Sequence, residues 1–483
     1  MNQTDNIRYD ADHDSISKNA AGENPAGGKS KEELHRIYAI LSKNENVPFP
    51  ENIREEHFQV PFLDHTGTPR TAKGCLYLPE SDRPLPLVYF SYYKITRDSF
   101  ELARCLNEGW AVASPFEKQD HNSELTRDAL AANSALLYEL RHRPEIDAER
   151  IALTGGSAGG YTAMMLSALH LFPCCTTAAG AFANVYFNFR HYAPYLSTFN
   201  APAAMALREE ERADLMTLLS HLPIPYGIVF NTCRTPEIDA RLDDLDTAAA
   251  VTPTMLTDCY SNPLMEQHNT SDILVPVDQI TRSFTYEHVS SDLPDDFRIR
   301  LSDYPLPEGF SRSFVEQLPE GSFTERLVSL VPEGSVGELP FDEKPFQINI
   351  IDEGEPQSHG SHGSDIPKGN LSDLAFLSHY FTQGNADNFL TDGKLRLLLK
   401  RCAGLSAALP AHTDEAAERE GIYGSLSVYR KEAAEQLAVY QKNHPGEDIA
   451  GRMRVLAEQE TELAEAAAFC IEAVEKTGQL KGV

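Results

Sequence analysis

A nucleophilic serine is indicated by the spacing Gly155-x-Ser157-x-Gly159 in this 483-residue chain. A serine on a sharp strand-to-helix turn projects its hydroxyl above a sheet, and a glycine two residues to either side lets the backbone pack without a Cβ clash. An apolar run precedes the motif and a helical pattern follows it. The pattern predicts an activated serine, with the amide of Ala158 directed to where an oxyanion would form. A phosphate-binding loop fits less well, because the Lys-Ser/Thr pair of such loops is absent.

Strand patterns alternate with helix patterns on both sides of this serine. A hairpin is predicted from residues 55–64 and 70–79, which a Gly/Pro-containing turn joins. The further strands expected are 84–93, 110–116, 150–155, 176–184, 252–261 and 345–354, and the helices expected between them are 96–109, 123–141 and 160–171. This alternation predicts an α/β fold with a mostly parallel sheet and helices on both faces.

Composition divides the chain into three parts. Residues 1–30 are polar and without periodicity, which predicts a disordered tail. Residues 31–384 form the α/β domain, and two stretches within it are too long for simple connections. We expect 185–250, rich in aromatic residues at its start, to be a cap over the site, and 283–344 to be a second insertion.

The remaining part, residues 385–483, has the composition of helices. Apolar side chains recur there every seven residues. Three of these are each followed, four residues later, by a further apolar side chain. This seam comprises Ile449, Met453, Leu456, Leu463, Ala467, Cys470 and Val474. Such a seam serves either packing within the chain or a homodimer through the C-terminal helices, and Glu460 interrupts it.

The segment IDAERIALTGGSAGG at 146–160 resembles the one that leads into the nucleophilic serine of the α/β-hydrolase superfamily. The resemblance covers about residues 50–384 and lies nearest the serine esterase and prolyl-peptidase-like branch. It implies the α/β-hydrolase fold, here with a cap insertion and a C-terminal helical extension. It also implies a catalytic triad in the chain order Ser, Asp or Glu, His.

The resemblance directs the search for the acid and the base downstream of Ser157. Asp272, in HNTSDILVPV, is similar to the family's acid before an apolar-Val-Pro turn, and Asp258 is the fallback. His359 and His362 follow the strand expected at 345–354, and either could serve as the base. These two histidines could otherwise bind a metal, but no third ligand has a recognisable spacing. We therefore expect neither a metal nor an organic cofactor.

A second oxyanion donor should come from the loop after the strand at 84–93. The His-Gly-Gly run of many esterases is missing there, and the chain has Ser91-Tyr92-Tyr93-Lys94 instead. The Tyr-Lys pair looks like that of hydrolases in which a tyrosine supplies the donor. Tyr92 or Tyr93 could therefore contribute through the backbone amide or the phenol, and the alternative is that both tyrosines only pack under the cap.

These residues together predict a serine hydrolase that cleaves a carboxylic ester or related acyl bond in a small-molecule substrate through an acyl-enzyme on Ser157. A compact serine peptidase or an acyltransferase would use the same residues. About 50 residues before the first strand leave no room for the propeller of large prolyl peptidases, which favours an esterase or a compact peptidase. A non-catalytic, hydrolase-like interaction protein is the alternative from another class.

Charge and composition exclude other classes. With 42 Lys and Arg against 72 Asp and Glu, the formal net charge is −30, which disfavours nucleic acid and anionic lipid as partners. No apolar stretch approaches the roughly 18 residues that a membrane span needs. The eight cysteines form no CxxC pair, and we expect reduced, buried thiols. A cytoplasmic location is expected.

Overall fold

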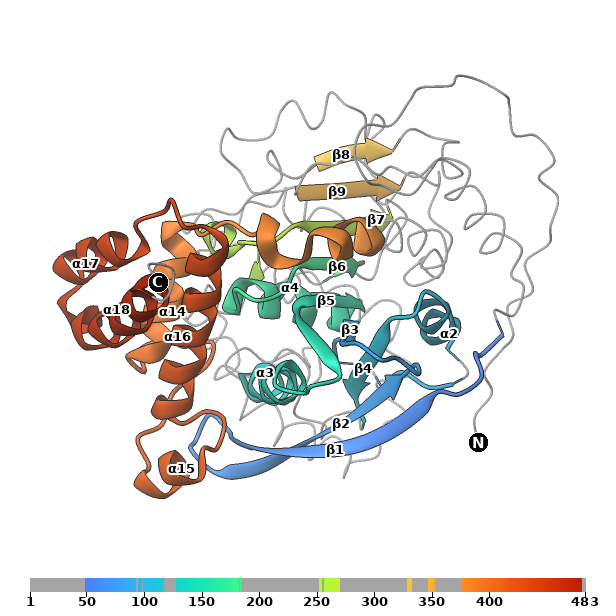
Figure 1. Ribbon diagram of the computed structural model, residues 1–483, viewed down its shortest axis with the longest axis horizontal. Helices are drawn as coiled ribbons and strands as arrows, with labels where there is room; N and C mark the ends of the chain where they lie inside the picture. The colour runs from blue at the N-terminus through green and yellow to red at the C-terminus, as the bar shows by residue number, and fades with distance from the viewer. Residues whose placement is uncertain are drawn as a thin grey trace, which may run out of the picture.

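The computed structural model describes residues 48–92, 94–97, 99–116, 127–181, 183, 252–253, 256–269, 328–331, 346–351 and 376–479. Their centre is one nine-stranded sheet in the order β1-β2-β4-β3-β5-β6-β7-β9-β8 (Figure 1). The pairs β1–β2 and β2–β4 are antiparallel, and every pair from β4 to β8 across the sheet is parallel. The predicted mostly parallel sheet is confirmed.

The first strands follow the alternation of the sequence closely. The hairpin consists of β1 (Arg54–Leu63) and β2 (Pro69–Leu78). The parallel strands are β3 (Leu85–Phe90), β4 (Ala111–Pro115), β5 (Ile146–Gly156), β6 (Cys175–Ala179), β7 (Leu264–Asn269), β8 (Val328–Val331) and β9 (Phe346–Ile351). Residues 252–261 depart from the prediction, and the stretch 283–344 contains a strand that was not predicted.

Helices cover both faces of the sheet, as its alternating side chains require. On one face, Tyr89 and Leu153 pack with side chains of α3 (Arg127–Arg141) and α4 (Ala158–Leu169). On the other face, Val88 and Ala152 pack with α2 (Phe100–Asn107) and with the helical residues 376–383. Adjacent residues of one strand enter opposite cores, because successive side chains of a strand point to opposite sides.

The strand predicted at 252–261 is wrong. The described residues of this stretch are irregular apart from the 3₁₀ helix η4 (Thr257–Cys259), and β7 begins at Leu264. The sequence of β7, LMEQHN, hides a strand because four of its six residues are polar. Glu266 is nevertheless fully buried, and its carboxylate accepts the amide of Ala181 at 3.0 Å. A buried carboxylate that accepts a backbone amide thus occupies a position where the pattern required an apolar residue.

The stretch 283–344 also contributes to the sheet. Strand β8 lies inside it and pairs in parallel with β9, with Leu330 beside Ile350. A four-residue strand is too short for its apolar alternation to be recognised, so this strand was not predicted. The tail 1–30 and the cap 185–250 lie outside the described residues.

Five helices form the C-terminal region. They are α14 (Asp392–Cys402), α15 (Glu415–Glu420), α16 (Leu426–Asn443), α17 (Ile449–Gln459) and α18 (Ala464–Gln479). The seven-residue seam is divided between α17 and α18 by a 3₁₀ turn, and its side chains are buried against α14 and α16 of the same chain. The seam therefore serves packing within the chain, and its apolar side chains are not exposed to a second copy.

Candidate active site

Ser157 lies at a sharp turn between β5 and α4. Its backbone has φ 56° and ψ −122°, a conformation that residues with a Cβ rarely adopt. Two hydrogen bonds fix the turn: the amide of Ser157 donates to Ala179 O at 2.8 Å, and the amide of Tyr161 donates to Ser157 O at 3.0 Å. The predicted strand-to-helix serine turn is confirmed in its backbone geometry.

Glycines make this turn sterically feasible. A Cβ at Gly155 would lie 2.4 Å from the carbonyl carbon and oxygen of Gly159. A Cβ at Gly160 would lie 2.9 Å from the Cβ of Ala181, in the segment that leaves β6. The backbone before Ser157 thus contacts the first turn of α4 directly, which only glycine permits.

Ala158 is the first residue of α4. The amides in the first turn of a helix have no acceptor within that helix, and the helix dipole makes this end partly positive. The amide of Ala158 is therefore suited to receive negative charge that develops beside Ser157. The oxyanion role of Ala158 stays a prediction.

The loop after β3 leaves the sheet beside this turn. In the parallel pair, Phe90 lies opposite Thr154, and the amide of Ser91 donates to Thr154 O at 2.8 Å. Tyr92 follows with φ 72°, a second positive φ at a residue other than glycine. Its side chain is only 2% exposed and belongs to the core cluster that contains Ala158, and its amide donates to Asn133 Oδ1 at 3.4 Å. Tyr93 lies outside the described residues.

The strands that precede the expected acid and base end at the same edge of the sheet. Because β5, β6, β7 and β9 are parallel, their carboxyl ends lie together, and Asn269 at the end of β7 pairs with Ile351 at the end of β9. Asp272 follows β7 by three residues (272 − 269), and His359 follows β9 by eight (359 − 351). Asp272, His359 and His362 themselves lie outside the described residues.

The fallback acid, Asp258, is at the wrong edge. It lies in η4 before β7 begins, and therefore at the amino end of the parallel strands, opposite to Ser157. Its backbone carbonyl accepts a hydrogen bond from the hydroxyl of Thr391 in the C-terminal region. Asp258 is thus a structural residue. Strand β7 ends at Asn269, three residues before Asp272 in the sequence.

A second Ser-His-Glu arrangement is buried between α3 and the C-terminal region. Ser134 Oγ lies 2.9 Å from His170 Nε2, and His170 Nδ1 lies 3.4 Å from a Glu432 carboxylate oxygen. All three residues are fully buried, so no substrate reaches this serine. Burial lowers the pKa of His170 to about 4, although the carboxylate of Glu432 favours the charged form. The cluster joins structural elements and is not a second active site.

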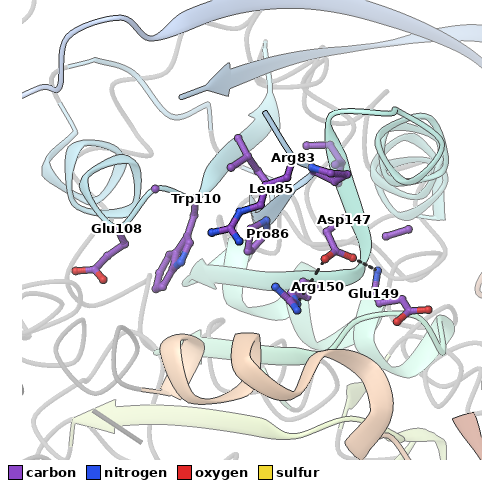
Figure 2. Close-up of a pocket in the computed structure, with 12 residues that line it drawn as sticks. Arg83, Leu85, Pro86, Glu108, Trp110, Asp147, Glu149 and Arg150 are labelled. Atoms are coloured by element: carbon purple, nitrogen blue, oxygen red, sulfur yellow. Dashed lines mark hydrogen bonds and ion pairs between the residues drawn. The ribbon is translucent and has the colours of Figure 1, made fainter. Parts of the chain in front are cut away.

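The pocket in Figure 2 lies away from Ser157. Its volume is about 710 Å³, and it is lined at the amino ends of β3, β4 and β5 by Arg83, Trp110 and Arg150, among others. Arg150 is paired with Asp147 at 3.5 Å. This pocket is therefore at the edge of the sheet opposite to the serine turn.

Three further observations concern only the described part of the chain. It contains no group of three or more His, Cys, Asp or Glu side chains arranged to hold a metal ion. None of its helices has the length and apolarity to cross a membrane. Its seven cysteines are free and buried, as their scattered spacing predicted.

The strand order and the strained serine between β5 and α4 define an α/β-hydrolase fold. The sequence profile of the prolyl oligopeptidase family matches residues 118–217, which include Ser157. This match confirms the resemblance to prolyl-peptidase-like α/β-hydrolases. None of the curated proteins compared with the chain matches it.

Solved structures of the same class are distant. The chain is similar to the acylaminoacyl peptidase of Pyrococcus horikoshii at 13% identity and a TM-score of 0.38, over 72% of this chain and 43% of that one. A puromycin hydrolase is 13% identical with a TM-score of 0.36, over 68% of this chain and 40% of that one. Oligopeptidase B of Leishmania major is 9% identical with a TM-score of 0.37, over 68% of this chain and 37% of that one. The chain thus spans less than half the length of these structures.

Proposed function

We propose that this protein is a serine hydrolase that cleaves an acyl bond through an acyl-enzyme on Ser157. The observation that carries the proposal is the strained backbone of Ser157 between β5 and α4. Such strain costs about 1–3 kcal/mol and persists where the surrounding structure fixes it, which is a property of functional sites. The glycines in contact behind the serine are the part of the structure that fixes it here.

In the proposed reaction, Ser157 Oγ attacks the carbonyl carbon while His359 or His362 takes the hydroxyl proton. The histidine then returns that proton to the leaving group as the bond to the acyl carbon breaks. Water then attacks the acyl carbon while the histidine takes its proton, and the histidine returns that proton to Ser157 Oγ as the acyl-enzyme bond breaks. Asp272 orients the histidine, and the amide of Ala158 with a group of Tyr92 or Tyr93 stabilises the oxyanion.

Peptide or other amide bonds are the favoured substrates. The profile match to the prolyl oligopeptidase family includes the serine turn itself, and this moves the preference away from the carboxylic ester favoured by the sequence alone. The missing His-Gly-Gly run after β3 agrees with this choice, because that run is typical of many esterases. Ester cleavage remains the second candidate, because the same acyl-enzyme chemistry serves both bonds.

The test is an intact-mass measurement after exposure to a fluorophosphonate, with Ser157→Ala as the control. We expect one adduct on the wild-type protein and none on the variant. Wild-type protein should then release p-nitroaniline from N-acylated peptide p-nitroanilides and p-nitrophenol from matched esters. A folded wild-type protein with neither adduct nor turnover would contradict the proposal and favour a non-catalytic interaction protein.

A further inference from the structure

Asn133, on α3, is held in one orientation by its surroundings. Its side chain is 1% exposed, and its Nδ2 donates to Ala129 O at 2.8 Å. Its Oδ1 accepts from the hydroxyl of Tyr89 at 2.7 Å and from the backbone amide of Tyr92 at 3.4 Å. The donor to Ala129 O distinguishes nitrogen from oxygen in this amide, so Oδ1 must face β3 and the loop after it.

The backbone that Asn133 contacts is strained. Tyr92 has φ 72°, a left-handed conformation that is unfavourable for a residue with a Cβ. Tyr92 is two residues beyond Phe90, which pairs with Thr154, and Ser157 is three residues beyond Thr154. The strained loop and the strained serine therefore leave adjacent strands side by side.

We propose that Asn133 is a positioning residue, which holds the loop after β3 so that the second oxyanion donor faces Ser157. This inference rests on the proposed function. Because the amide of Tyr92 donates to Asn133, it anchors the loop. The donor to substrate is then a different group of this loop. Asn133 reaches the reaction through the loop alone and does not touch the substrate.

The role predicts a specific kinetic signature. An oxyanion donor acts on the transition state more than on the bound substrate, so a displaced donor lowers kcat and leaves KM nearly unchanged. Loss of one donor costs about 10²- to 10³-fold, and a displaced donor should cost about 10- to 100-fold. A general loss of packing would instead lower the fraction of active protein and the thermal midpoint.

Two matched variants separate these explanations. Asn262→Ala removes an equally buried asparagine, bonded to Ser167 and Thr176, at the opposite edge of the sheet. Tyr89→Phe removes the other donor to Asn133 Oδ1 and leaves the contact with Tyr92.

The experiment compares these variants with the wild-type protein in two assays. The first is steady-state kinetics on one p-nitroanilide or p-nitrophenyl ester that the wild-type protein cleaves, and the second is the saturation kinetics of fluorophosphonate labelling at Ser157. Asn133→Ala should lower kcat and the maximal labelling rate by about 10- to 100-fold at unchanged KM, whereas Asn262→Ala and Tyr89→Phe should stay within about threefold. Should Asn133→Ala not fold, Asn133→Ser takes its place with the same expectation.

The outcomes are distinct. An unchanged kcat in Asn133→Ala, or an equal loss in Asn262→Ala or Tyr89→Phe, would overturn the positioning role while wild-type turnover upholds the hydrolase. Wild-type protein without labelling or turnover would overturn both.

Discussion

Lys394 Nζ donates to the carbonyl of Ser167 at 2.6 Å, and this contact joins the C-terminal helices to the helix that begins directly after Ser157 (Figure 1). Lys394 also donates to Ala168 O and His170 O, each at 2.7 Å, and Arg401 donates to Leu169 O at 2.8 Å. The last carbonyls of a helix have no partner within it, and cations near them are favourable. Lys394 and Arg401 of α14 thus donate to the backbone carbonyls at the carboxyl end of α4.

Lys394→Met should lower the free energy of unfolding by about 3 kcal/mol, because it leaves buried carbonyls without a donor. Chemical denaturation at neutral pH measures the change. Lys476→Met removes an exposed lysine whose ion pair with Glu472 lies within α18, and should stay within about 0.5 kcal/mol of the wild-type value. Equal stability of the two variants would show that α14 does not stabilise α4.

Unfolding should become easier as the pH falls from about 6.5 towards 4, because of His170. Burial lowers the pKa of this histidine to about 4, against the pull of Glu432, and Arg401 and Lys394 lower it further. Between the two pKa values the unfolded chain binds more protons, so stability is present above pH 6.5 and decreases below it. From pH 7 to pH 5 the loss is on the order of 2 kcal/mol.

His170→Gln should flatten this pH dependence, measured as denaturation midpoints at pH 7 and pH 5. His142 provides the comparison, because its hydrogen bond to Glu435 raises its pKa and its contribution to stability has the opposite sign. His142→Gln should therefore steepen the decrease slightly. An unaltered slope in His170→Gln would contradict the assignment.

Gly155→Ala should abolish labelling of Ser157 or prevent folding, because the added Cβ would lie 2.4 Å from backbone atoms of Gly159 that cannot move independently. Gly446→Ala serves as the control, since a Cβ there meets nothing within 4 Å. Labelling rate and thermal midpoint are measured for both. A Gly155→Ala protein with wild-type labelling would show that the close contact does not shape the turn.

Asp272→Asn should lower kcat by about 10⁴-fold, the order of loss expected when the triad acid no longer fixes the tautomer of the histidine. Asp258→Asn should leave kcat within about threefold, because Asp258 is at the opposite edge of the sheet. Steady-state kinetics on the same substrate compares the two. The reverse ranking would reassign the acid.

His359→Ala and His362→Ala identify the base. The one that supplies it should lose about 10³-fold or more in kcat at a near-normal thermal midpoint, and the other should retain most of its activity. Comparable small losses in both would leave neither histidine as the base and would contradict the proposed triad.

Much of the fold was predictable from local patterns. The hairpin, the strands up to β6 and the helices between them follow apolar alternation and helical spacing, which need only neighbouring residues. The serine turn was predictable for the same reason, since Gly155, Ser157 and Gly159 lie within five residues. Strand β7 was not predictable. Its buried Glu266 accepts a hydrogen bond from the amide of Ala181, and this contact forms only when strands distant in the sequence have paired.

The serine, the glycines beside it and the sheet that carries them could be predicted from the sequence, because they depend on residue type and short-range spacing. Three features became apparent only in the folded structure: Asp258 lies at the wrong edge of the sheet, the C-terminal seam is buried within the chain, and Asn133 accepts a hydrogen bond from Tyr92. Each of these depends on contacts between residues tens to hundreds of positions apart. Such contacts are selected by the packing of the whole molecule, and no local pattern encodes them.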